Sequence, residues 1–323
     1  MRVSTVPHRS GNAPLAERSC WRCHGRRCAV SVILEDASPI LVNGTELTFL
    51  ERGQGDPLVL VHGGVSDLRT WHHQIDVFAE TFRTICYSRR YHVPNIPIPP
   101  NAADPVQTHV DDLAQLIETL EAVPAHVVGH SWGGLITLML ARQWPDLCRS
   151  LVLIEPPVVS MHVRIPPKFV ELIGLFLRSP RLAFAIMKLG AGALSPAEKA
   201  FRRGDDNAAI EHLGRGVLGD LGYERLSAER RRQVWENRGP DRAQALHHSF
   251  PDLIRESFTS VTLPVLLVSG ARSPPLFGML NDGLLKRLPN ARRCVISGAS
   301  HIVHEDSPDD LNSAILKFLH EVR

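Results

Sequence analysis

Short apolar segments alternate along the chain with longer segments in which apolar residues recur every three or four positions. The apolar segments predict buried strands, and the periodic segments predict helices. Strands are expected at 57–64, where the strand ends in glycines, and at 82–88, 125–131, 149–157, 263–270 and 292–298, with a hairpin at 40–53. Helices are expected at 71–80, 106–123, 132–143, before Leu288, and from Ser307. Buried strands that alternate with helices predict a parallel sheet covered on both faces.

The alternation stops in the middle of the chain. Residues 157–260 contain helical patterns and no clear strand, and one helix is expected to begin at Ser195 with a capping box closed by Glu198. The predicted fold class is therefore α/β, a mostly parallel, doubly wound sheet of about eight strands with a helical insertion lying over it. The core is expected at 32–156 and 261–323, and the insertion at 157–260.

Residues 1–31 lack apolar periodicity and carry six arginines against one acid, Glu17, for a charge of +5. The whole chain carries +2, so the remainder carries 2 − 5 = −3, and charge gives no argument for nucleic-acid binding by the folded part. The segment from Cys20 to Cys28 lacks the second ligand pair that is usual in zinc sites, so no metal is predicted.

We expect residues 1–31 to form a disordered basic tail that contributes little to the core. A chain that starts at Ser31 should keep its fold and its activity, as measured by circular dichroism and turnover. Loss of folding on truncation, or release of stoichiometric zinc, would contradict this expectation.

The remaining composition, 44% apolar and 22% charged, is that of a globular protein. No uninterrupted apolar run of about 18 residues predicts a membrane span. The most apolar region, 169–194, contains charges and is expected to form amphipathic helices. Cys86, Cys148 and Cys294 are scattered, which is typical of buried thiols in a reducing compartment. We expect a cytoplasmic protein with no membrane partner, no nucleic-acid partner and possible association as a homodimer.

A glycine-flanked serine carries the strongest chemical signal. The segment VVGHSWGG, 127–134, places Gly129, Ser131 and Gly133 between an expected strand and an expected helix. Such a turn is too tight for side chains near the serine, and it exposes the hydroxyl at the edge of the sheet beside a helix N-terminus. A plain helix N-cap is the alternative role of Ser131. The strand–turn–helix context favours a nucleophile.

Two further segments supply groups that a serine nucleophile needs. Acyl transfer generates an oxyanion, and we assign the N–H groups of Gly64 and Trp132 as its oxyanion hole. His62 precedes Gly63 and Gly64 at the end of the apolar segment LVLVHGG, and we expect it to hold this loop rather than to transfer protons. His301, just past the last strand, is the expected base because histidine titrates near neutrality. His304 is expected to be a surface or packing residue.

With HGG, GHSWGG and GASH in this order and at this spacing, the chain resembles the α/β-hydrolase fold family over residues 32–323. The resemblance implies a Ser–acid–His triad, no cofactor, and a helical cap between strands six and seven. That cap corresponds to the insertion at 157–260. Two departures stand out. The turn at 88–95 reads SRRYHVPN, and Ser273 occupies the position after strand seven where the family often carries its acid.

Because Ser273 cannot serve as the triad acid, the acid is expected at the end of another strand, and strand six carries a candidate. The resemblance implies that this strand lies beside the strand that ends at Ser131, and Glu155 stands at its carboxyl end. We therefore predict Glu155 as the triad acid, after strand six. Glu305 and Asp306 are closer to His301 in sequence, but they precede a helix start, where acids favour the helix N-terminus.

The sequence thus predicts a serine hydrolase that forms an acyl-enzyme on an ester, lactone or activated C–C bond of a small, mostly apolar molecule. A cofactor-free haloperoxidase-like perhydrolase and a non-catalytic small-molecule-binding protein on the same fold remain alternatives. Apolar residues of the insertion, such as Phe169, Leu172, Leu175 and Phe176, are expected either to line the substrate pocket or to form the core of the insertion. Trp235 and Asn237 either face the pocket or belong to an exposed charged helix.

Overall fold

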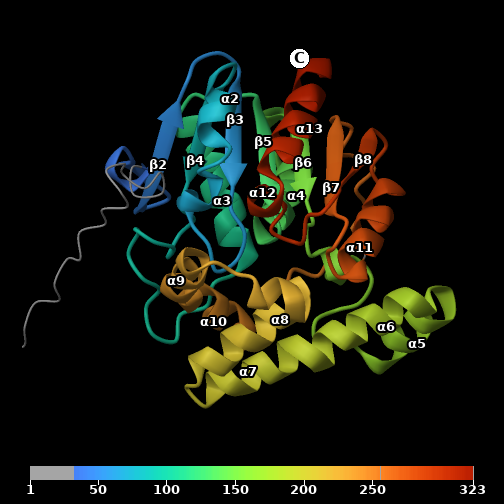
Figure 1. The fold of residues 1–323 in the computed structure, drawn as a ribbon. Helices are drawn as coiled ribbons and strands as arrows, with labels where there is room; N and C mark the ends of the chain where they lie inside the picture. Colours follow the sequence, from blue (N-terminus) through green and yellow to red (C-terminus); the bar gives the residue numbers. More distant parts are fainter. Residues whose placement is uncertain (1–32, 255, 323) are drawn as a thin grey trace, which may run out of the picture.

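The computed structural model describes residues 33–254 and 256–322 (Figure 1). One eight-stranded sheet organises them, with the strand order β1-β2-β4-β3-β5-β6-β7-β8. Its strands are β1 Ser38–Val42, β2 Thr45–Arg52, β3 Pro57–Val61, β4 Arg83–Tyr87, β5 Ala125–His130, β6 Cys148–Ile154, β7 Val265–Gly270 and β8 Ala291–Ile296. β1 and β2 form the antiparallel edge, and all pairings from β4 to β8 are parallel. The predicted α/β fold class is confirmed.

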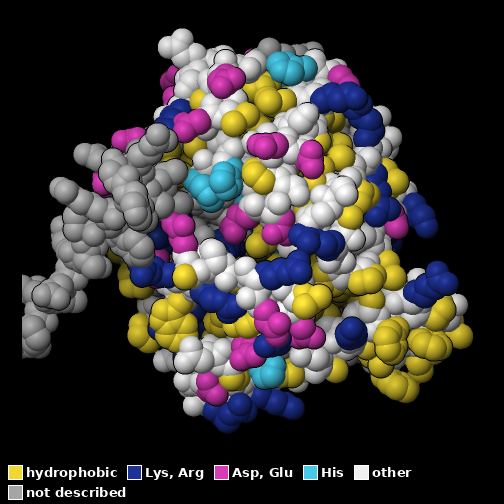
Figure 2. Space-filling view, viewed as in Figure 1, with side chains coloured by type: hydrophobic (Ala, Val, Ile, Leu, Met, Phe, Trp, Pro, Cys, Tyr) yellow, Lys and Arg dark blue, Asp and Glu magenta, His cyan; other side chains and the backbone are white. Residues whose placement is uncertain are grey.

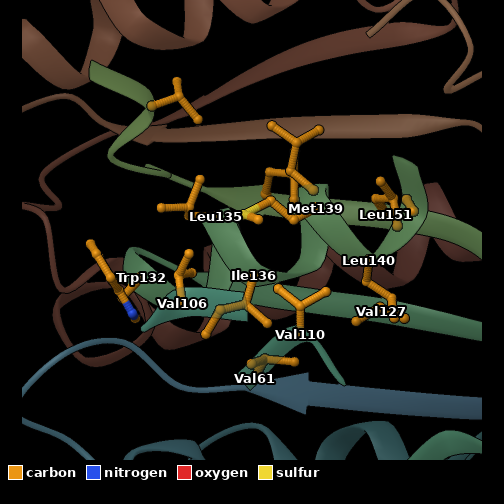
Figure 3. Packing of buried hydrophobic residues seen from close by; sticks show 14 of the residues in the cluster. Val61, Val106, Val110, Val127, Trp132, Leu135, Ile136, Met139, Leu140 and Leu151 are labelled. Atoms are coloured by element: carbon orange, nitrogen blue, oxygen red, sulfur yellow. The ribbon is translucent and has the colours of Figure 1, made fainter. Parts of the chain in front are cut away.

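Helices cover both faces of this sheet, as the continuously apolar strands predict. One face carries α3 (Val106–Thr119), α4 (Trp132–Gln143) and α11 (Pro275–Leu285), and the other carries α2 (Ile75–Ala79), α12 (Val303–Asp306) and α13 (Pro308–Glu321). Successive residues of a strand point to opposite faces, so each strand supplies both cores. Figure 3 shows side chains of α3 and α4 packed against Val61, Val127 and Leu151 of the sheet.

Between β6 and β7 the described chain contains helices and no strand, and we call this part the helical layer. Its helices are α5 Phe169–Arg178, α6 Pro180–Leu189, α7 Ser195–Arg202, α8 Asp206–Glu224, α9 Ala228–Glu236 and α10 Arg238–His247. Figure 1 shows the layer below the carboxyl ends of the parallel strands, with α9 and α10 at one end and α5 and α6 at the other. The layer therefore lies over the edge of the sheet at which the predicted site residues gather.

One local expectation is wrong. Ser195 does not cap α7, because the π-helical turn Gly190–Leu194 runs directly into that helix and Leu194 already has helical backbone angles. A serine inside a continuous helical run has no free first-turn N–H group to accept from. Pro196 lies in the first turn of α7, as the sequence predicts.

A buried carboxylate joins the helical layer to the core. Asp67, which is fully buried, accepts hydrogen bonds from the side chains of Arg69 at 2.6 and 2.9 Å, of Gln233 at 2.8 Å and of Asn237 at 2.6 Å. Gln233 and Asn237 come from α9 and the residue that follows it. Arg69 neutralises the charge of Asp67 from within the core, whereas the two amide donors reach Asp67 only when the layer is docked.

Replacing Asp67 with alanine should lower the free energy of unfolding by about 2–4 kcal/mol, because it leaves the buried side-chain amides of Gln233 and Asn237 without the carboxylate that they share as acceptor. Urea denaturation measures this change. Glu236→Gln is the matched control, since Glu236 also pairs with Arg69 but its side chain is 34% exposed. The control should cost less than about 1 kcal/mol. Equal losses in the two variants would mean that Asp67 does not anchor the layer.

Candidate active site

Ser131 occupies a strained turn between β5 and α4. Its backbone angles, φ 50° and ψ −118°, lie outside the usual regions for a residue with a side chain. The turn is packed so closely that a Cβ on Gly129 would lie 2.5 Å from Gly133 O, and a Cβ on Gly133 would lie 2.3 Å from Val61 O. Ser131 N–H donates to Ile154 O at 2.8 Å, which ties the turn to β6. The predicted need for two flanking glycines is explained by these contacts.

His301 and Glu155 are joined by a short hydrogen bond. His301 Nδ1 lies 2.6 Å from Glu155 Oε2, and Glu155 Oε1 accepts the Gly270 N–H at 2.8 Å. Both side chains are buried. With the carboxylate as acceptor, Nδ1 carries the proton and Nε2 is left as the basic nitrogen of the neutral ring. His130 Nε2 contacts His301 O at 2.9 Å, and the Phe277 ring lies 4.2 Å from the His301 ring, so the imidazole is held from several sides.

The other candidate acids have different partners. Glu305 contacts Thr70 Oγ1 at 3.3 Å and Arg230 Nη1 at 3.5 Å. Burial alone would raise the pKa of Glu305, but Arg230, His304 and His72 together outweigh burial and bring the pKa to about 2. Asp306 accepts the Ser300 N–H at 2.6 Å. The hydroxyl of Ser273 is buried and has no partner among the described residues. Of these acids, only Glu155 is bonded to His301 in the part of the chain described.

The turn after β3 is held so that one backbone N–H remains free. Gly63 O lies 2.9 Å from His62 Nδ1 and accepts from Arg89 Nη2 at 2.8 Å. Because the carbonyl and the next N–H of a trans peptide point in opposite directions, these two bonds also orient the Gly64 N–H. Trp132 is the first residue of α4, so its N–H has no partner within the helix. Neither N–H has a hydrogen-bond partner in 33–254 or 256–322.

His62 makes the loop-holding contacts that the sequence analysis expects. Its Nε2 accepts the Arg89 N–H at 2.9 Å. Burial, followed by the charge of Arg89, lowers the pKa of His62 well below its usual value, so the ring is neutral. Arg89 belongs to the SRRYHVPN turn that departs from the family pattern. His304 is a packing residue, because it is buried and its ring lies 5.3 Å from that of Trp71.

A cavity of about 640 Å³ brings the other predicted residues together. Ser131, His301, Gly64 and Trp132 all contribute to its wall, while Glu155 lies behind His301. Ser131 Oγ makes no hydrogen bond to the described chain. The helical layer forms most of the opposite wall, which is mainly apolar.

The expected pocket residues of the layer have mixed positions. Leu172 lines the cavity and Leu175 is buried, whereas Phe169 and Phe176 point outward and are 79% and 56% exposed. Trp235 is also outside the cavity, with the Arg238 guanidinium 4.0 Å from its ring centre. Asn237 is likewise absent from the wall, because it is buried against Asp67. The helical period predicts which residues share a face but not which face meets water.

The family comparison agrees with this architecture. Residues 56–308, more than half of the chain, match the family described as alpha/beta hydrolase fold. The chain belongs to the α/β-hydrolase family.

Several proteins to which this hydrolase is similar are named for hydrolytic reactions. It is 24% identical over 289 residues to (E)-2-((N-methylformamido)methylene)succinate hydrolase of Acinetobacter baylyi, which covers 86% of this chain and 96% of that protein. It is 28% identical to esterase YbfF of Escherichia coli, over 68% of this chain and 77% of that one. The solved enol-lactonase of Burkholderia xenovorans LB400 has a TM-score of 0.66 at 20% identity, covering 88% of this chain and 100% of that chain, and so shows the shared fold. The chain is therefore an enzyme of the hydrolase class.

One charged residue of the hydrolase's cavity was not anticipated from the sequence. Asp241 of α10 accepts the Val65 N–H at 2.7 Å, and its Oδ1 lies 2.5 Å from the position of a Cβ on Gly64. Burial is the largest influence on this carboxyl and raises its pKa to about 6. In the sequence, Asp241 is an ordinary acid in the first turn of a helix. Its approach to Gly64 depends on how α10 packs against the core, which no local pattern specifies.

A larger cavity, of about 960 Å³, lies between the helical layer and the turn at 69–73. It does not include Ser131 or His301, so we place the chemistry in the smaller cavity. Among the described residues no group of three His, Cys, Asp or Glu side chains is arranged to hold a metal ion. The cysteines at 20, 23 and 28 lie outside the described residues, as does the whole predicted basic tail.

Proposed function

We propose that this enzyme is a serine hydrolase in which Ser131 is the nucleophile, His301 the general base and Glu155 the acid that orients it. The observation that carries the proposal is the 2.6 Å contact between His301 Nδ1 and Glu155 Oε2, behind a cavity that contains Ser131. That contact fixes the tautomer in which Nε2 can accept the serine proton.

The reaction follows from this arrangement. Nε2 of His301 takes the proton of Ser131 as the hydroxyl oxygen attacks the substrate carbonyl. The negative charge that develops on the carbonyl oxygen is stabilised by the N–H groups of Gly64 and Trp132, which are preorganised and need no movement. The His301 imidazolium then protonates the leaving group. A water molecule, activated by the same nitrogen, releases the acyl group from Ser131.

The cavity supports a small, mostly apolar substrate. We infer that the helical layer at 157–260 is a cap that closes over the core, because it supplies the apolar wall opposite Ser131. Esters and lactones are the first candidates, since related proteins are named an esterase and an enol-lactonase. An activated C–C bond and a perhydrolysis reaction use the same nucleophile, and a substrate panel distinguishes them.

The test combines covalent labelling with turnover. A fluorophosphonate probe should label the wild type, and Ser131→Ala and His301→Ala should abolish or strongly reduce labelling. Ser273→Ala is the matched control, because Ser273 is also a serine at a strand end but its hydroxyl is buried away from the cavity. Turnover is measured on esters, lactones, vinylogous diketones and peracid formation. Labelling that survives Ser131→Ala would overturn the proposal, as would the absence of turnover on the whole panel.

The proposed oxyanion hole makes a separate prediction. Val65 has φ 41°, in the left-handed region, where a residue with a side chain is disfavoured by about 1–2 kcal/mol. The hydrogen bond from its N–H to Asp241 stabilises that turn. Gly64→Ala should lower kcat by roughly 10²-fold. The new Cβ would displace the Asp241 carboxylate, which holds the Val65 N–H, and would thereby disturb the Gly64 N–H of the proposed oxyanion hole.

A double-mutant cycle isolates this contact. Asp241→Ala removes the carboxylate that a methyl group at position 64 would meet, so Gly64→Ala should cost much less in the Asp241→Ala background than alone. Asp241→Asn keeps an oxygen for the Val65 N–H and should lose less activity than Asp241→Ala. Steady-state kinetics of the single and double variants measure the coupling. Strictly additive effects on kcat would show that Asp241 does not act through Gly64.

A further inference from the structure

Helix α5 is apolar on two sides. Leu175 points inward and is buried, and Leu172 reaches the substrate cavity. The outward side would be polar in an ordinary surface helix. Here it carries Phe169, Val170, Ile173, Phe176 and Leu177, of which Phe169 and Leu177 are each 79% exposed. The outward side of α5 is therefore apolar, unlike that of an ordinary surface helix.

Helix α6 extends the exposed surface. It packs beside α5 after the single residue Ser179, and its Phe184 and Met187 are 67% and 50% exposed. Figure 2 shows a yellow patch at the end of the molecule that Figure 1 assigns to α5 and α6. We call this surface the hairpin face; it consists of Phe169, Val170, Ile173, Phe176, Leu177, Phe184 and Met187. Contiguous exposed apolar surfaces of this kind mark interaction sites.

The charges around the hairpin face have one sign. Lys168, Arg178, Arg181 and Lys188 are all exposed, and none has an ion-pair partner within the described residues. The only acid between residues 168 and 188 is Glu171, and it is paired with Arg164. An apolar centre surrounded by unpaired cations is complementary to a surface that is apolar inside and anionic outside.

We propose that the hairpin face docks on the surface of an anionic lipid bilayer. Aromatic and aliphatic side chains would enter the boundary between headgroups and acyl chains, while the four cations would contact lipid phosphates and carboxylates. A second copy of the chain fits less well, because a two-fold contact would bring two sets of cations together. The attachment is peripheral, since no described helix is long and apolar enough to cross a membrane.

The position of the hairpin gives the docking a use. Ile186, Met187 and Leu172 line the substrate cavity, so α5 and α6 separate the proposed membrane surface from Ser131 by one layer of helices. Apolar molecules dissolved in the bilayer would be concentrated beside the cavity. This step rests on the proposed function, whereas the docking itself does not.

Vesicle co-sedimentation with the full chain tests the docking. Vesicles of phosphatidylglycerol and phosphatidylcholine in equal parts should bind the protein, and pure phosphatidylcholine should bind it at least tenfold more weakly. Replacing Phe169, Phe176 and Leu177 with serine should weaken binding to the anionic vesicles at least tenfold. The same loss is expected when Lys168, Arg178, Arg181 and Lys188 are replaced with glutamate.

Matched controls separate this effect from general stickiness. Leu41, Leu221 and Val295 are exposed apolar residues elsewhere, at 67%, 69% and 51%, and their triple serine variant should bind like the wild type. Hydrolysis of a water-soluble ester, or thermal unfolding if no ester is turned over, checks that each variant is folded. Unchanged vesicle binding by the hairpin variants would overturn the proposal and would point to another surface, such as the basic segment 1–31. A wild-type dimer that becomes monomeric in the hairpin variant without any vesicle binding would assign the face to a second copy.

Discussion

Ser131→Ala is expected to lower kcat by about 10⁶-fold while leaving the fold unchanged, because residues that act as one catalytic unit lose nearly all of its effect when the nucleophile is removed. Alanine retains the Cβ of serine, so the strained turn between Gly129 and Gly133 keeps its packing. The residual rate should come from substrate binding and from the N–H groups of Gly64 and Trp132, which the substitution does not touch. Single-turnover kinetics on the best ester or lactone of the panel measure the loss.

Comparison with a second serine decides whether that loss is specific. Ser273→Ala should retain wild-type turnover, since the Ser273 side chain lies outside the cavity wall. Circular dichroism and unfolding by urea should give the same curves for both variants and the wild type. A loss below about tenfold in Ser131→Ala would rule out the acyl-enzyme.

Glu155→Gln should lower kcat by about 10⁴-fold, and the hydrogen bonds of the site explain why. The Gly270 N–H donates to one side-chain oxygen of Glu155 at 2.8 Å. In the glutamine variant the amide oxygen would keep this bond, so the amide nitrogen would face His301 Nδ1. Because the amide nitrogen is a donor, His301 Nδ1 would have to accept its hydrogen bond, and the imidazole proton would move to Nε2. The imidazole would then hold the wrong tautomer to take a proton from Ser131.

Three further variants test whether another acid carries the role. Glu305→Gln should reduce kcat far less, because Glu305 contacts Thr70 and Arg230 and makes no hydrogen bond to His301. Ser273→Asp alone should have little effect. Combined with Glu155→Gln, it should restore part of the activity if a carboxylate after β7 can reach the imidazole. Near-wild-type turnover in Glu155→Gln would contradict the assignment, and a collapse in Glu305→Gln alone would transfer it there.

The sequence predicts most of the core because apolar strands alternate with helices. It predicts most of the candidate site because the site residues follow the carboxyl ends of these strands. Ser131 and Glu155 each follow a short apolar strand, His301 follows the last strand, and parallel strands present their carboxyl ends at one edge of the sheet. The contact between Glu155 and His301 follows from that order. Asp241 could not be predicted in the same way, since α10 meets the 63–65 turn only through packing between segments that are far apart in sequence.

The outward face of α5 could not be predicted for a different reason. The segment 169–178 is apolar at nearly every position, so helical periodicity does not say which side faces the core. The sequence analysis treats the charges in this region as the polar side of amphipathic helices. The structure instead places Phe169, Phe176 and Leu177 outside, with the cations around them.

The two ends of the helical layer offer unequal freedom for engineering. Within the described chain, the polar side-chain contacts from helices of the layer to the core come from α9, α10 and the adjoining Asn237, through Asp67 and Val65 among others. Helices α5 to α8 contribute apolar side chains to the cavity wall, and apolar packing tolerates substitutions that conserve volume. A library intended to change substrate preference should therefore vary Leu172, Ile186 and Leu213 on the cavity wall. Diversity placed in α9 and α10 would instead yield mostly unfolded or misdocked variants.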